Sequence, residues 1–200
     1  MKSLKKYKLS QSLIFIAILS ALILLSYAII YRNRLHLERP NILLISIDAL
    51  RPDHLSCYGY QRNTSPHIDN LAKEGLIFTQ AISQSSSTIP SIPSLFTSLY
   101  PSEHGINRIR DKSSFLVPTL AEILKENGYH TAGIVAHKLS HTGIDRGFDS
   151  IYFNRAAKAD IITQRAINWL SENKNRRFFI WLHYFDPHPP YLPPSPYDEL

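Results

Sequence analysis

Cysteine is nearly absent from the sequence, whose 200 residues include one, Cys57. A disulfide framework within the chain is therefore excluded. Acidic residues are absent from positions 1–34, which hold six lysines and arginines and so account for the whole net charge of +6. Residues 35–200 carry 16 basic and 16 acidic residues. A body with no net charge lacks the basic footprint of a nucleic-acid-binding protein, so we expect no nucleic-acid partner.

Charge is also absent from 13–31, a run of apolar residues interrupted by Ser20 and Ser26. Its length is close to the roughly 20 residues that cross a bilayer as a helix. We predict a short basic cytoplasmic tail at 1–12, a transmembrane signal-anchor helix at 13–31 and a polar stalk at 32–39. Lysines before the run favour a cytoplasmic N-terminus. The body at 40–200 is then expected on the extracytoplasmic side of a single-pass membrane protein, in the periplasm or at the cell surface.

Two alternatives to the anchor remain open. Ser26-Tyr27-Ala28 is a small-x-small site, which is typical of a cleaved signal peptide. A buried core helix is the other alternative, and the lack of a polar face disfavours it. The first two interpretations both place the body outside the cytoplasm.

Strand-like and helix-like segments alternate along the body. We predict strands at 41–47, 76–82, 131–136 and 178–184, and helices at 66–75, 118–128 and 158–174. This alternation indicates an α/β fold with a mostly parallel sheet. A sheet of these strands alone has few strands for this architecture. The proline-rich stretch at 186–200 does not resemble the natural end of a domain, so we expect the domain to be truncated.

Asp48 is the first candidate site residue, because it directly follows the buried strand at 41–47. Ligands of open α/β sheets bind at the carboxyl ends of the strands, and a carboxylate there suits a hard cation. The alternative is an aspartate that caps the next turn.

Thr88 is the second candidate. Pro90 and Pro93 suit the first turn of a helix and are not expected later in it, which places Thr88 at or just before a helix N-terminus. Backbone N–H groups at such an end favour phosphate or sulfate, and a hydroxyl there is a potential nucleophile. The alternative is a Ser/Thr-rich loop with ordinary caps.

The third candidate is His188, which with Asp186 lies just past the predicted strand at 178–184. His183 falls within that strand, and the simplest interpretation is that its side chain packs in the core. The alternative for Asp186 and His188 is a stiff, proline-rich turn.

These pieces occur in an order that resembles the sulfatase branch of the alkaline-phosphatase superfamily. The resemblance covers residues 39–200. Its motifs are the strand and aspartate at 39–54, followed by 57–60, 64–72, 88–91 with 95–105 downstream, 128–132 and 187–191.

The resemblance implies roles for individual residues. Asp48 would be a metal ligand, Thr88 would hold the nucleophile position and also bind the metal, and His188 would contact the anionic group or the leaving oxygen. The implied fold is an α/β sandwich around a mostly parallel sheet. The implied cofactor is a divalent metal ion, which is calcium if the protein is sulfatase-like, or manganese, magnesium or zinc if it is phosphotransferase-like.

Departures from the family pattern point to a second possibility. Main-type sulfatases convert Cys or Ser to formylglycine and carry Arg four residues on, whereas this chain has Thr88 and Ile92, and Thr cannot undergo that conversion. Ala49 replaces a second aspartate, and His137 with Lys138 stands where the family has Lys-Trp-His. An overlapping alignment on Ser91 also lacks the arginine.

The sequence therefore predicts a membrane-anchored, metal-dependent hydrolase of sulfate or phosphate esters, acting on an anionic ester substrate. The alternatives are a cell-surface phosphotransferase for lipid or glycan head groups and a truncated inactive relative.

Overall fold

The fold was analysed in a computed structural model, which describes residues 15–31, 39–108, 111, 116–137 and 139–199. The chain divides into two units, Met1–Asn41 and Ile42–Leu200. In the first unit, residues 15–31 form a helix. No helix of the described ranges is both long and apolar enough to cross a membrane. The transmembrane helix predicted at 13–31 has no support from this finding, and its residues 13 and 14 lie outside the described part.

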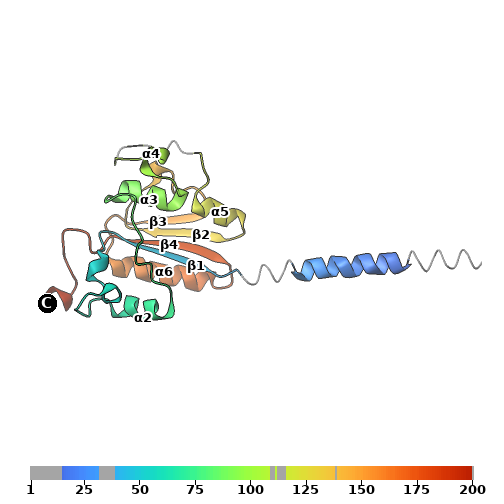
Figure 1. The fold of residues 1–200 in the computed structure, drawn as a ribbon, viewed down its shortest axis with the longest axis horizontal. Coiled ribbons are helices and arrows are strands. Elements are labelled where there is room, and N and C mark those ends of the chain that lie inside the picture. Colours follow the sequence, from blue (N-terminus) through green and yellow to red (C-terminus); the bar gives the residue numbers. More distant parts are fainter. Residues whose placement is uncertain (1–14, 32–38, 109–110, 112–115, 138, 200) are drawn as a thin grey trace, which may run out of the picture. The chain divides into compact units, whose positions relative to one another are not determined.

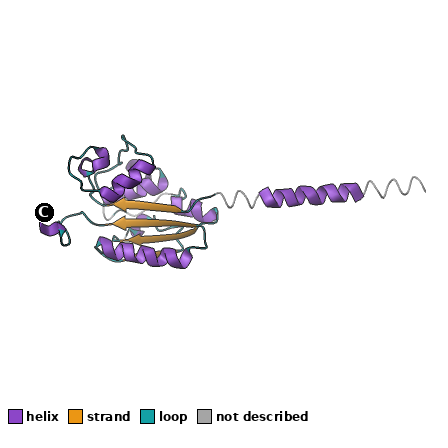
Figure 2. Cartoon of the chain, turned by 90° about the horizontal axis from the view of Figure 1, so that it is seen from below, coloured by secondary structure: helices purple, strands orange, loops and turns teal. Residues whose placement is uncertain are grey.

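The second unit is built on one four-stranded sheet, in which every pair of neighbouring strands is parallel (Figures 1 and 2). The spatial order is β1-β4-β2-β3. The strands are β1 (Ile42–Ile47), β2 (His130–Val135), β3 (Ser150–Phe153) and β4 (Phe178–Tyr184). The predicted α/β class with a parallel sheet is confirmed. β3 was not predicted from the sequence, because its four residues are too few to show the alternation of a strand.

Helices connect β1 to β2 and β3 to β4, as is usual for parallel crossovers, whereas among the described residues the link from β2 to β3 has only a short 3-10 turn at Ser140–Thr142. The helices are α2 (Pro66–Glu74), α3 (Thr88–Thr97), α4 (Pro101–His104), α5 (Leu120–Glu126) and α6 (Ala159–Asn173). Thr119 starts α5 with a capping box, in which its hydroxyl accepts from Glu122 N–H and the Glu122 carboxylate accepts from Thr119 N–H.

Helices cover both faces of the sheet (Figure 1). On one face, Ile92 and Phe96 of α3 and Ala121 of α5 pack with Trp181 and Phe179 of β4. On the other face, α6 packs on β2 and β4 through a second cluster, which contains Ile162, Ala166, Ile134, Ile180 and Leu182. The central strands are therefore buried on both sides, which explains why β4 reads as a continuous apolar run.

The strand predicted at 76–82 is wrong. These residues form a loop, and Leu76, Phe78 and Ile82 are largely exposed. An apolar run forms a strand only where a neighbouring strand pairs with its backbone N–H and C=O groups. In the described part of the chain, the sheet order β1-β4-β2-β3 gives residues 76–82 no such neighbour. Apolar composition alone therefore gave the wrong answer here.

The position predicted for Pro93 also fails. Pro93 lies inside α3 rather than in its first turn. Ser65 precedes α2, but its hydroxyl makes no capping bond. It instead accepts from Ser56 N–H and donates to Asp69, which ties α2 to the preceding loop.

Asp149 fixes the start of β3 against β2 and α5. Its carboxylate accepts hydrogen bonds from Lys125 at 2.7 Å and from the Thr131 N–H at 2.9 Å. Burial alone would raise the pKa of Asp149, but these bonds outweigh it and lower the pKa from 3.8 to about 2. A carboxyl group whose pKa falls on folding stabilises the folded state above its ordinary pKa, and that stabilisation is lost as the pH falls towards its folded value.

We expect Asp149→Asn to lower the free energy of unfolding by about 1–2 kcal/mol at neutral pH, after discounting for partial exposure. The difference from the wild type is expected to shrink as the pH falls from 3.8 to about 2. Urea unfolding of both proteins across this range measures it. A difference that stays constant over the whole range would contradict the assigned pKa shift.

Candidate functional site

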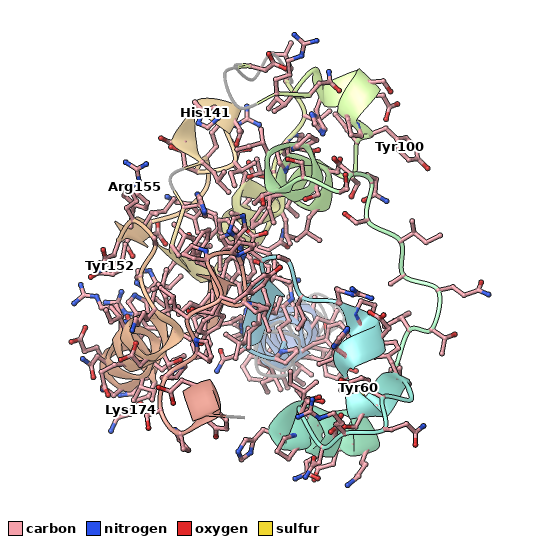
Figure 3. All side chains as sticks on the ribbon, turned by 90° about the vertical axis from the view of Figure 1, so that its left-hand side faces the viewer. Tyr60, Tyr100, His141, Tyr152, Arg155 and Lys174 are labelled. Atoms are coloured by element: carbon pink, nitrogen blue, oxygen red, sulfur yellow. The ribbon has the colours of Figure 1, made fainter. Side chains whose placement is uncertain are left out.

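The candidate site lies at the carboxyl ends of the parallel strands, the edge that Figure 3 faces. β1 ends at Ile47, and the N–H of Asp48 donates to Tyr184 O at 2.9 Å, which continues the pairing of β1 with β4. Ala49 then adopts a left-handed conformation, with φ of 56°. Such backbone strain in a non-glycine residue is common at functional sites. The chain therefore turns sharply after Asp48 and leaves the half-buried carboxylate at the sheet edge.

Thr88 is the first residue of α3, as the proline spacing indicated. Its Oγ1 donates to the Asp48 carboxylate, 3.0 Å from Oδ1 and 3.1 Å from Oδ2. The structure thus brings together two of the three predicted site residues, which lie 40 positions apart in the sequence. A hydroxyl bonded to a carboxylate at a helix N-terminus is a suitable arrangement for attack on an anionic ester.

A buried histidine holds the first turns of α3 in place. His104 Nδ1 accepts from the Ile106 N–H at 3.1 Å, so its Nε2 carries the hydrogen and donates to Ser94 Oγ at 3.0 Å. Ser94 in turn donates to Pro90 O at 3.2 Å. Burial lowers the pKa of His104, which keeps the ring neutral. His104 is therefore a core residue that supports the segment carrying Thr88.

Side-chain alternation places further polar groups on the same face of the sheet as Asp48. Ser46 precedes Asp48 on β1 and pairs in register with His183 on β4. His137 lies two residues past the end of β2, and its ring centroid is 6.2 Å from that of His183. Burial is the main cause that lowers the pKa of His137, and Asp48 opposes this effect.

His183 was interpreted from the sequence as a packed residue, and the structure does bury it. Burial lowers its pKa to about 4. His137 was named in the sequence analysis without a firm role, and Lys138 lies outside the described residues. The signal that would have identified both histidines is the register of the sheet, which a single sequence does not contain.

His188 is half-buried in the loop after β4, where its ring stacks on Phe185 with centroids 4.4 Å apart. Its Nδ1 lies 2.7 Å from Pro189 O. It is close enough to His137 to lower the pKa of that residue. In the described part of the chain, no hydrogen bond joins His188 to Asp48 or Thr88. Its predicted contact with the anionic group therefore remains a prediction.

A cavity of about 560 Å³ opens beside His188. It lies between the start of α6 and the loop after β4, and its lining includes Lys158, Pro190, Tyr191, Leu192 and Tyr197. Ligand pockets of proteins commonly have this size and a mostly apolar lining.

The predicted metal ligands do not form a complete centre by themselves. A hard divalent cation takes about six or more oxygen ligands, whereas Asp48 and Thr88 supply one carboxylate and one hydroxyl. Among the residues that the structure describes, no group of three or more His, Cys, Asp or Glu side chains is arranged to hold a metal ion.

Arg51 and Asp53, which follow Asp48 closely in the sequence, pair with each other at 2.6 Å on the exposed surface.

The chain is similar to known proteins in both sequence and fold. The sequence profile named Sulfatase matches residues 40–199. The N-acetylgalactosamine-6-O-sulfatase of Bacteroides thetaiotaomicron is 40% identical over 103 residues, which are 49% of this chain and 20% of that protein. The N-acetylglucosamine-6-O-sulfatase of the same species is 27% identical over 178 residues, 78% of this chain and 32% of that protein.

Among solved structures, one protein in complex with its substrate D-glucosamine-2-N,6-O-disulfate is 26% identical and superimposes with a TM-score of 0.69. The match covers 78% of this chain and 36% of that chain. This chain thus spans between about a fifth and about a third of the length of these relatives.

Proposed function

The chain belongs to the sulfatase family, and we propose that it acts in the hydrolysis of sulfate or phosphate esters with Thr88 as the nucleophile. The observation that carries this proposal is the hydrogen bond from Thr88 Oγ1 to both oxygens of Asp48. Thr88 attacks the sulfur or phosphorus atom while its hydroxyl proton passes to Asp48, its oxygen forms the new ester bond, and the bond to the leaving oxygen breaks. The leaving oxygen then takes up a proton from solvent. Water then cleaves the enzyme-bound ester.

Each residue of the proposed site has its own role in the reaction. Asp48 orients the Thr88 hydroxyl and accepts its hydrogen bond. In this proposal His188, which lines the cavity, contacts the leaving oxygen. The apolar wall with Tyr191 and Tyr197 accommodates the part of the ester that does not react.

A divalent metal ion stays a prediction for this protein. When bound, such an ion would neutralise charge on the transferring group. Asp48 would be one of its oxygen ligands, and the described residues do not supply the rest. Equilibrium dialysis of the wild type and Asp48→Ala against calcium, magnesium, manganese and zinc tests this. Equal binding of the metal ions by the two proteins would show that Asp48 is not a metal ligand.

A phosphotransferase is the second candidate, and the identity of residue 88 favours it. An unmodified threonine cannot become formylglycine, so its hydroxyl must itself form the covalent intermediate. We expect cleavage of 4-nitrophenyl phosphate to exceed cleavage of 4-nitrophenyl sulfate. Adding a lipid or glycan hydroxyl acceptor and analysing the products separates transfer from hydrolysis. Faster cleavage of the sulfate ester would contradict the phosphotransferase interpretation.

Localisation outside the cytoplasm also stays a proposal, and it rests on the sequence of residues 1–34. Lysines precede an apolar run there, and the body has no net charge. Protease treatment of intact cells, or of spheroplasts if the cells are bacterial, is expected to digest the body. Protection of the body until the cells are lysed would refute the proposal.

A further inference from the structure

His183 is a deeply buried histidine beside the candidate site, and one of its nitrogens has no hydrogen-bond partner among the described residues. Its side chain is 1% exposed. Nδ1 lies 2.9 Å from Ser46 Oγ, whereas Nε2 is buried and makes no hydrogen bond to any described residue. A buried polar atom without a partner destabilises the folded state, so its presence calls for an explanation.

The hydrogen bonds around Ser46 determine which nitrogen of His183 carries the proton. Ser46 Oγ accepts from Trp181 Nε1 at 2.9 Å, so its own hydrogen is available to donate. His183 Nδ1, at 2.9 Å, is a better acceptor position than Leu182 O, at 3.4 Å. Nδ1 therefore accepts, and the unpartnered Nε2 bears the hydrogen. The pKa of His183, which burial lowers to about 4, agrees with a neutral ring.

Two titratable groups act electrostatically on the ring of His183. They are Asp48, which favours positive charge on the ring, and His137, which opposes it. Asp48 directly follows β1, two residues after Ser46, and its N–H continues the pairing with β4. Side-chain alternation therefore puts the carboxylate on the side of the sheet that holds the imidazole. The Nε2–H dipole thus lies in the field of a carboxylate that accepts the Thr88 hydroxyl through both oxygens.

We propose that His183 is a positioning residue for the Asp48–Thr88 pair. Ser46 and Trp181 lock the imidazole in its Nε2–H tautomer, and that N–H dipole holds the Asp48 carboxylate in the orientation that receives Thr88. A histidine that only filled space would need no particular tautomer. This inference rests on the proposed function, because its effect is read through the reactivity of Thr88.

Asparagine and glutamine at position 183 separate the two nitrogens. The amide of His183→Asn reaches the Nδ1 position and keeps the bond to Ser46, but it removes the Nε2–H. The longer glutamine side chain of His183→Gln places an N–H at the Nε2 position but loses the hydrogen bond to Ser46. We expect His183→Asn to slow cleavage of 4-nitrophenyl phosphate roughly 100-fold through kcat, with KM little changed, and His183→Gln to recover most of that rate.

The matched control is the same pair of substitutions at His130, a histidine at the amino end of β2 that pairs with Asp149. Both His130 variants are expected to cleave at the wild-type rate. A role for His183 in packing alone predicts equal losses for Asn and Gln, or better activity for Asn. Either result would overturn the proposal.

Thr88→Ala separates this proposal from the proposed function. If Thr88→Ala is inactive and His183→Asn retains the full rate, then the positioning role fails and the function stands. If Thr88→Ala is fully active, then the proposed function fails, and the positioning role fails with it.

The tautomer itself provides a readout that does not depend on activity. The ¹⁵N NMR spectrum of the histidine rings is expected to show His183 fixed as Nε2–H in the wild type and averaged between tautomers in Ser46→Ala. This measurement needs no substitution at position 183, so it tests the tautomer even if both His183 variants fold poorly. An Nδ1–H tautomer in the wild type would overturn the proposal.

Discussion

Replacing Thr88 with alanine is expected to lower the rate of ester cleavage by at least roughly 1,000-fold, because it removes the proposed nucleophile. The loss should appear in kcat for both 4-nitrophenyl phosphate and 4-nitrophenyl sulfate. Thr88→Ser keeps the hydroxyl and its reach to Asp48, so it is expected to retain a substantial part of the activity. Steady-state kinetics of the two variants measure the difference.

Ser91 provides the matched control for this experiment. It lies one turn further along α3, and its hydroxyl donates to Thr88 O at 3.3 Å rather than to Asp48. The overlapping family alignment would place the nucleophile at Ser91 instead. We expect Ser91→Ala to remain active. An inactive Ser91→Ala together with an active Thr88→Ala would show that the nucleophile has been assigned to the wrong residue.

Replacing Phe96 with alanine is expected to destabilise the fold by about 3–5 kcal/mol, a large part of the stability of a typical domain. Phe96 is 2% exposed and packs edge-on against Trp181, with ring centroids 4.8 Å apart. It also contacts Phe148, at 5.9 Å. Because Phe96 belongs to α3, the cavity left by its loss also weakens the support of Thr88.

Leu95 is the control for Phe96, since it is the adjacent residue of α3 and is 46% exposed. Leu95→Ala is expected to change the free energy of unfolding by less than about 1 kcal/mol. Urea denaturation followed by tryptophan fluorescence compares the two, since Trp181 reports on the core. Equal effects of the two substitutions would mean that α3 does not pack on the sheet through Phe96.

The sequence pointed to Asp48 and Thr88 as candidates for a physical reason. Each stands at the end of a regular element, and such ends have local signals: a buried apolar run before Asp48, and prolines soon after Thr88. The resemblance to sulfatases then linked the two residues. The structure adds their hydrogen bond, which no spacing along the chain reveals.

What the sequence did not predict depends on register and burial. His183 meets Ser46 across 137 positions, because β1 and β4 pair as neighbours. The apolar run at 76–82 looked like a strand, yet it is a loop, since apolar residues do not specify which strand they will join. Pro93 was expected in the first turn of α3, but the helix continues past it.

The most direct test of the central claim is the mass of the covalent intermediate. The protein is purified from the cells that naturally produce it and mixed with 4-nitrophenyl phosphate or 4-nitrophenyl sulfate. The mixture is quenched in acid, digested and analysed by mass spectrometry. The account predicts one phosphoryl or sulfuryl group on Thr88, which is absent from Thr88→Ala. Ester cleavage with no modified Thr88, or with the group on another residue, would contradict it.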